Sequence, residues 1–281
     1  MTTTTPSARV DISQFSGKET LMRLLRQEYG HTLEMLVAAG EEDLGKQTPC
    51  EAWRVRDLAG HLVDVAFSYN GYFRQQRNGY PQAEPLGMRV YARALEKSAL
   101  LYLGSGKWEL LSRMDSQVDT LFRTFDALTE QEWAGLLIPH KYVGPVPAFM
   151  MATFQLMDYS VHNWDFEMAL GHEARVDDES AETLVPYMFG LWQLCFEPER
   201  AGDASMTVGV EITSGPQPDH WTVTIENGTF AYVPGKALEP GATFRFAARD
   251  FCLDAYQREQ RGEAHGDPAV IEKFRSLFFT V

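Results

Sequence analysis

The sequence predicts a two-domain protein, an all-α four-helix bundle followed by a small α+β domain. Up to residue 173 the apolar side chains recur with a period close to 3.6, which is typical of the buried faces of helices. After residue 203 they alternate with polar or small residues, as they do along half-buried strands. We therefore expect a disordered tail (1–16), the bundle (17–173), a linking helix (174–203) and the α+β domain (204–281).

The first two bundle helices follow from apolar spacing and from start signals. The first is expected over residues 19–39, where leucines and a valine lie on one face. The second is expected to begin at Thr48, Pro49 and Glu51, which match a capping threonine, a proline at the first helical position and a glutamate three residues after the threonine. Its apolar stripe carries His61.

The third and fourth bundle helices complete this domain. The third region spans residues 89–128 and is expected to break at Gly104 and Gly106. The fourth runs from 148 to 170, where Gly171 can end it because glycine readily adopts the left-handed cap conformation. Two segments rich in glycine or proline are expected to be loops: 79–88 and 138–147.

The remaining third of the chain changes its pattern. A helix over 178–196 is expected to lead into strands that begin with Met206. The pair Asn227-Gly228 favours a tight hairpin between two of them. Helices over 250–261 and 268–279 are expected to close the domain, the second starting with an aspartate cap and proline at Asp267-Pro268.

The bulk composition excludes several classes of partner. The net charge of −14 and the pI near 4.9 would repel nucleic-acid phosphates and anionic membranes. No stretch approaches the roughly 18 apolar residues of a membrane span, and the N-terminal residues lack the apolar core of a signal peptide. The three cysteines are widely spaced and show no CxxC pair, so we expect a protein of the reducing cytoplasm.

Three potential metal ligands stand out in the bundle. Asp158 and His162 are four residues apart, so on a helix they lie on one face. His61, on another helix, would complete a three-ligand site with one open position, which is typical of catalytic zinc. An unpaired buried carboxylate would be costly, so Asp158 needs a metal, His162 or a basic group as its partner. The alternative is an Asp–His hydrogen bond that fixes the register of the bundle.

Several other polar residues are considered as members of the same site. Asp165 could orient a metal ligand as a hydrogen-bond acceptor, or could bind a backbone amide. Cys50, just before a helix, fits buried packing better than a nucleophilic role. The remaining histidines lie in more polar sequence surroundings and are expected to be unrelated to the site, although His140 could line a pocket mouth.

Two longer strings carry a resemblance to a known family: TPCEAWRVRDLAGHL, and later DYSVHNWDFEMALG. With these motifs the chain resembles, along nearly its whole length, the DinB-like, mycothiol-dependent maleylpyruvate isomerase family. The resemblance implies a metal-binding four-helix bundle and a C-terminal domain related to sterol carrier proteins. It also implies His61, Asp158 and His162 as metal ligands, zinc as the expected metal, and mycothiol or a similar thiol as partner. The family's second ligand is glutamate, whereas this chain has the shorter aspartate.

The function implied is that of an enzyme in which the metal activates a low-molecular-weight thiol. The thiolate would add to an electrophilic small molecule, giving cis–trans isomerisation or S-transfer. Arg258 and Arg261 are candidates to clamp a carboxylate of the substrate, since guanidinium binds carboxylates in a bidentate manner; the alternative is a solvated helix end. Two rival functions remain: a metal-free biosynthetic enzyme using Asp158 and His162 as an acid–base pair, and a protein that binds a hydrophobic ligand.

Overall fold

The computed structural model describes residues 17–216 and 219–280. Within them the chain divides into two compact units, residues 17–176 and residues 177–280. The first unit is helical and the second carries a five-stranded sheet, so the predicted fold class is confirmed. The expected disordered tail over 1–16 lies outside the described residues. The helical unit contains the following elements: α1 (Lys18–Ala38), η2 (Asp43–Gly45), α2 (Val55–Arg77), α3 (Met88–Ala99), η3 (Leu100–Tyr102), α4 (Lys107–Ala127), α5 (Glu130–Gly135), β1 (Leu137–His140), β2 (Gly144–Pro147) and α6 (Ala148–Leu170).

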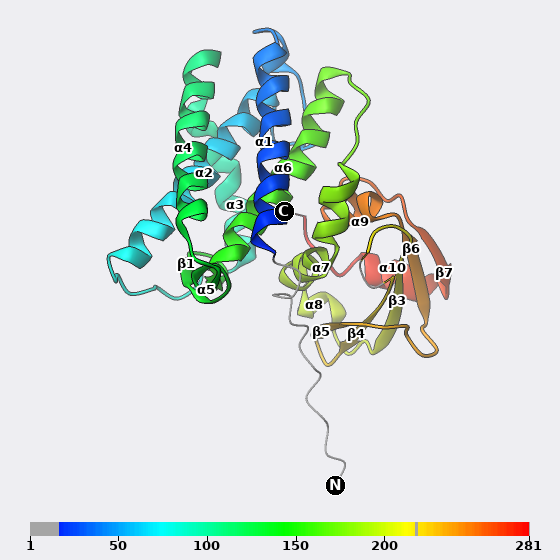
Figure 1. The fold of residues 1–281 in the computed structure, drawn as a ribbon. Coiled ribbons are helices and arrows are strands. Elements are labelled where there is room, and N and C mark those ends of the chain that lie inside the picture. Colours follow the sequence, from blue (N-terminus) through cyan, green and yellow to red (C-terminus); the bar gives the residue numbers. More distant parts are fainter. Residues whose placement is uncertain (1–16, 217–218, 281) are drawn as a thin grey trace. The chain divides into compact units, whose positions relative to one another are not determined.

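The four long helices α1, α2, α4 and α6 form the bundle (Figure 1). α1 packs along α6 and α2 packs along α4, while α2 also contacts α6. This last contact matters for function, because α2 carries His61 and α6 carries Asp158 and His162. α6 ends at Leu170 and is capped by Gly171, whose φ of 79° is the left-handed conformation expected there. The third helical region is interrupted between Tyr102 and Lys107, around the two predicted glycines.

The start of α2 differs from the prediction. Thr48, Pro49 and Glu51 lie in a turn, and the helix begins only at Val55. The Thr48 hydroxyl donates to the carbonyl of Trp53 at 2.7 Å instead of capping a helix. The cap is supplied later by Asp57, whose carboxylate accepts from the Arg54 amide at 2.9 Å. The short run of residues 47–54 therefore forms a loop of its own, and that loop borders the candidate site.

The segment 138–147, expected to be a loop, contains a two-stranded antiparallel hairpin instead. β1 and β2 pair residue by residue, with Pro139 opposite Pro145. Proline lacks an amide donor, and a two-stranded sheet tolerates it because both strands are edges. The hairpin packs against α2 and α6 and buries His140.

The second unit is an α+β domain whose sheet has the order β5-β4-β3-β6-β7. β3 and β6 are parallel, and the other neighbouring pairs are antiparallel. Asn227 and Gly228 have φ values of 51° and 70°, as the predicted tight hairpin between β4 and β5 requires. The unit contains these elements: α7 (Asp178–Cys195), α8 (Pro198–Ala201), β3 (Met206–Ile212), β4 (His220–Glu226), β5 (Thr229–Pro234), β6 (Ala242–Phe246), α9 (Ala248–Ala255), β7 (Glu263–Gly266) and α10 (Pro268–Arg275).

Aromatic side chains fill the core of this domain. Phe189 of α7 stacks on Trp221 of β4, with ring centroids 4.6 Å apart, and Phe274 of α10 lies 5.2 Å from Phe244 of β6. α10 starts as predicted, with the Asp267 carboxylate accepting from the amide of Ala269. α9 ends earlier than expected, at Ala255, so Arg258 and Arg261 follow the helix rather than belonging to its last turns. Among the described residues, no helix combines the length and apolar character needed to span a bilayer.

Candidate metal centre

The three predicted ligands come together inside the bundle. His61 of α2 and Asp158 and His162 of α6 each offer one possible ligand atom, and these atoms all lie within 4.8 Å of one another. His61 is 1% exposed and His162 is 4% exposed, whereas Asp158 is half-buried. Two buried imidazoles and one carboxylate form a donor set that suits zinc and leaves a coordination position open.

The two histidines are held at an angle to each other. Their ring centroids are 5.2 Å apart and the ring planes are nearly perpendicular, at 83°. Trp53, from the loop before α2, stacks on His61 with centroids 4.7 Å apart and an interplanar angle of 26°. The indole therefore fixes the plane of the His61 ring from the side of the loop.

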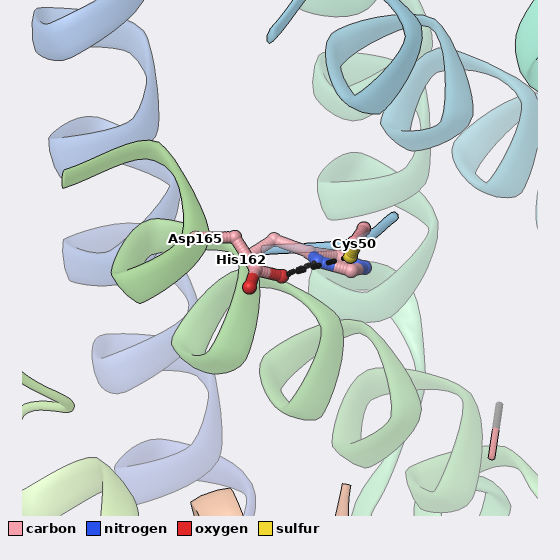
Figure 2. A group of neighbouring side chains, drawn as sticks. All are labelled: Cys50, His162 and Asp165. Carbon is pink, nitrogen blue, oxygen red and sulfur yellow. Dashed lines mark hydrogen bonds and ion pairs between the residues drawn. The ribbon is translucent and has the colours of Figure 1, made fainter. Parts of the chain in front are cut away.

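His162 is oriented by a buried carboxylate (Figure 2). Its Nδ1 lies 2.8 Å from Oδ2 of Asp165, which is fully buried. In a neutral imidazole the nitrogen that faces a carboxylate carries the proton, so Nε2 keeps the lone pair that a metal needs. The role predicted for Asp165 as an acceptor next to a ligand is thus supported by this contact.

Cys50 is hydrogen-bonded to the same carboxylate. Its thiol donates to Oδ2 of Asp165 at 3.2 Å, so one oxygen accepts from both Cys50 and His162 (Figure 2). The sequence predicted a packing role for Cys50 and did not predict this hydrogen bond. The two residues are far apart in sequence, so no local spacing reveals the contact; only their occurrence in the two motif strings connects them.

The surroundings of the Asp158 carboxylate show whether the cluster fits a metal. Its Oδ2 is buried and has no hydrogen-bond partner among the residues that the structure describes. Burial raises the pKa of this carboxyl from 3.8 to about 6, and the neighbouring His162 partly opposes that rise. A buried carboxylate oxygen without a donor is costly, and a cation at the centre of the cluster would offset that cost. The residues present therefore fit a divalent metal.

His140 was expected in polar surroundings, but the structure places it in an apolar, aromatic environment. It is 3% exposed and sits among aromatic rings, with the rings of Tyr72 and Phe154 5.2 and 5.8 Å away. Its Nδ1 accepts from the backbone amides of Tyr142 and Val143, and burial lowers its pKa to about 4. His140 is thus a neutral core residue of the bundle domain.

The predicted substrate arginines belong to the second unit. Arg258 donates to the carbonyl of Tyr256 at 3.2 Å and also borders a cavity of 190 Å³. Arg261 pairs with Glu259 and lies 3.8 Å from Asp250. Both guanidinium groups therefore have partners within their own domain, and their role toward a substrate stays a prediction.

The fold and the cluster define a two-domain protein with a candidate metal centre inside its helical bundle. The family model described as the mycothiol maleylpyruvate isomerase N-terminal domain matches residues 25–167, just over half of the chain, and the chain belongs to that family.

Comparison with solved structures gives the same fold. The crystal structure of the mycothiol-dependent maleylpyruvate isomerase is 14% identical, with a TM-score of 0.57, over 88% of this chain and 91% of that chain. A histidine-to-alanine mutant of that enzyme matches over the same shares at 14% identity, with a TM-score of 0.59. No curated protein sequence matches the chain.

Proposed function

We propose that this protein is a metal-dependent enzyme that activates a low-molecular-weight thiol for addition to an electrophilic small molecule. The observation that carries the proposal is the approach of His61, Asp158 and His162, whose possible ligand atoms lie within 4.8 Å of one another in the bundle. The fold around this cluster also supports the proposal, because the solved structures of the same fold are described as a mycothiol-dependent isomerase. Mycothiol or a similar thiol is therefore the proposed partner.

The three side chains would hold one divalent cation, with zinc as the expected metal. A bound metal would supply Lewis acidity, which lowers the pKa of a coordinating thiol below its usual value of about 8.5. Asp158 is one methylene shorter than glutamate, and zinc accepts either carboxylate. The bundle holds the two imidazoles close together on α2 and α6, 5.2 Å apart between ring centroids.

Each residue around the cluster contributes to this arrangement. Asp165 holds the Nδ1 proton of His162, so Nε2 remains an acceptor. Trp53 covers one face of His61 and limits the entry of water to that ring. Asp158 brings the only carboxylate of the three proposed ligands, and it is half-buried.

The reaction proposed is reversible addition of the thiol sulfur to an activated carbon–carbon double bond. The addition converts the double bond to a single bond, rotation follows, and elimination of the same thiol restores the double bond in the other geometry. No thiol is consumed in isomerisation, whereas in S-transfer the new carbon–sulfur bond remains and the neighbouring carbon of the former double bond takes up the proton that the thiol released. We further propose that Arg258 and Arg261 bind a carboxylate of the electrophile.

A thiol-dependent assay tests the proposal. The full chain, loaded with zinc, is incubated with maleylpyruvate and mycothiol, and both the isomer and any thiol adduct are measured by mass spectrometry. We expect activity that needs zinc and thiol together and that falls at least about a hundredfold in His61→Ala. His172→Ala is the matched control, since His172 is exposed and lies beyond the end of α6.

Three outcomes would contradict the proposal. Full activity of a folded His61→Ala variant would remove the metal site from the mechanism. Turnover that persists without thiol and in the presence of a chelator would favour the metal-free acid–base alternative. Co-purification of an apolar ligand with no turnover would favour the binding-protein alternative.

A further inference from the structure

Cys50 lies beside the candidate metal centre but is not one of the three proposed ligands. We infer that Cys50 is a positioning residue of this centre: its thiol fixes the carboxylate of Asp165, which in turn orients His162. The inference rests on the proposed function, since it assumes that His162 binds the metal. It assigns a role to a side chain that composition and packing alone do not explain.

The first argument is the shared oxygen. Oδ2 of Asp165 accepts from the Cys50 thiol at 3.2 Å and from Nδ1 of His162 at 2.8 Å. A carboxylate that is 0% exposed needs donors that stay in place, because water cannot substitute for them. Loss of the thiol hydrogen removes one donor from this oxygen, so the orientation of the carboxylate is held less firmly. The same holds for the imidazole that depends on it.

The second argument is how firmly the backbone holds Cys50. The carbonyl of Cys50 accepts from the Trp53 amide at 2.8 Å and from Nε2 of Gln47 at 3.2 Å. The same Gln47 amide also donates to the carbonyl of Trp53 at 2.8 Å. The loop of residues 47–54 thus places Cys50 on Asp165 and Trp53 on His61, so one rigid segment restrains both histidines of the cluster.

A direct role for Cys50 as a ligand is the competing interpretation. Cys50, Asp165 and His162 also bring possible ligand atoms within 4.8 Å of one another. In that arrangement, however, a metal would replace both hydrogen bonds to Asp165 and would draw Nδ1 of His162 away from the carboxylate. The contacts observed are those of a hydrogen-bonded chain, and they leave His162 able to serve the cluster with His61 and Asp158.

The test measures metal affinity rather than activity. The full chain is stripped with a chelator, and its affinity for Zn²⁺ is measured by competition with a chromophoric chelator. Because outer groups that orient a ligand typically change metal affinity by about 10- to 100-fold, we expect a loss of that size in Cys50→Ala. Cys50→Ser keeps a donor and should stay within about threefold of wild type by the same reasoning. Cys195→Ala, at a buried cysteine of the other domain, should leave the affinity unchanged.

The outcomes separate the inference from the function on which it rests. If wild type binds Zn²⁺ and Cys50→Ala binds it equally well, the positioning role is wrong while the metal site stands. If wild type binds no Zn²⁺, the proposed function itself fails. The absorption spectrum of the Co²⁺-substituted protein adds a second readout, because a thiolate ligand gives a charge-transfer band and a hydrogen-bonded thiol does not. We expect no thiolate-to-cobalt charge-transfer band without added thiol, and such a band, lost in Cys50→Ser, would make Cys50 a ligand instead.

Discussion

His140 is a buried histidine whose protonation should destabilise the bundle domain. Its Nδ1 accepts from two backbone amides, of Tyr142 and Val143, each at 3.3 Å. A proton on Nδ1 would break both hydrogen bonds and place a charge among aromatic rings. Replacing His140 with glutamine removes the titrating group but keeps a side-chain carbonyl that can accept from the same amides.

The magnitude follows from two pKa values. Burial lowers the pKa of His140 to about 4 in the folded protein, against about 6.5 for histidine in an unfolded chain. Between these values the unfolded chain binds more protons, so the free energy of unfolding decreases as the pH falls. A pKa difference of about 2.5 corresponds to about 3 kcal/mol. This stabilisation is fully present above pH 6.5 and is lost as the pH falls through the folded pKa of about 4.

The assay is urea unfolding of the metal-free full chain at several values between pH 7.5 and about 4.5, a range that covers most of this window. Because the chain has two compact units, unfolding is fitted as two transitions, and the one assigned to the bundle domain is compared. Wild type should lose about 2–3 kcal/mol more than His140→Gln over this range. His172→Gln, at an exposed histidine of the same unit, should follow wild type. Equal pH dependence in wild type and His140→Gln would refute the reasoning.

Three further changes test other parts of the structure. Trp53→Ala should weaken Zn²⁺ binding about tenfold, because a ring stacked on a proposed ligand is lost, and Trp53→Phe should restore most of it in the same chelator competition. Asn163→Ala should lower the free energy of unfolding by about 3 kcal/mol, since Asn163 donates to the carboxylate of buried Glu28 at 2.7 Å; an unchanged urea midpoint would contradict this. Gly266→Ala should lower the melting temperature of the second domain more than Gly235→Ala does. Both glycines have φ near 120°, but only at Gly266 would a Cβ meet a backbone carbonyl oxygen, 2.4 Å away. Equal melting temperatures of the two variants by circular dichroism would count against this clash.

Periodicity predicted the long elements well because packing and local preference agree there. α1, α6 and α7 begin and end within one residue of the expected bounds, and the caps at Gly171 and Asp267 are those expected. The errors occur where a local motif permits two structures. Thr48, Pro49 and Glu51 satisfy the pattern of a helix start, yet the tertiary contacts of the 47–54 loop take their hydrogen-bonding groups. The proline-rich strands β1 and β2 are too short for alternation to distinguish them from a loop.

In the candidate site, contacts within one helix could be predicted from spacing, whereas contacts between distant segments could not. Asp158 and His162 could be paired by spacing on one helix, whereas the approach of His61 required the packing of α2 on α6. Asp165 could be suggested as a partner of His162 because it lies three residues away, on the same helical face. The link to Cys50 crosses from the loop before α2 to α6, and the burial of His140 depends on a hairpin that was not predicted. Long-range contacts of this kind leave no periodic trace in one sequence.

The central claim is that His61, Asp158 and His162 bind a metal, and metal content tests it most directly. Elemental mass spectrometry of the purified full chain should find about one zinc per chain in wild type and almost none in His162→Ala. The absence of metal from wild type, together with failure to bind zinc when it is resupplied, would contradict the account. The three side chains would then be a buried hydrogen-bonding cluster, and thiol activation by a metal would no longer explain the site.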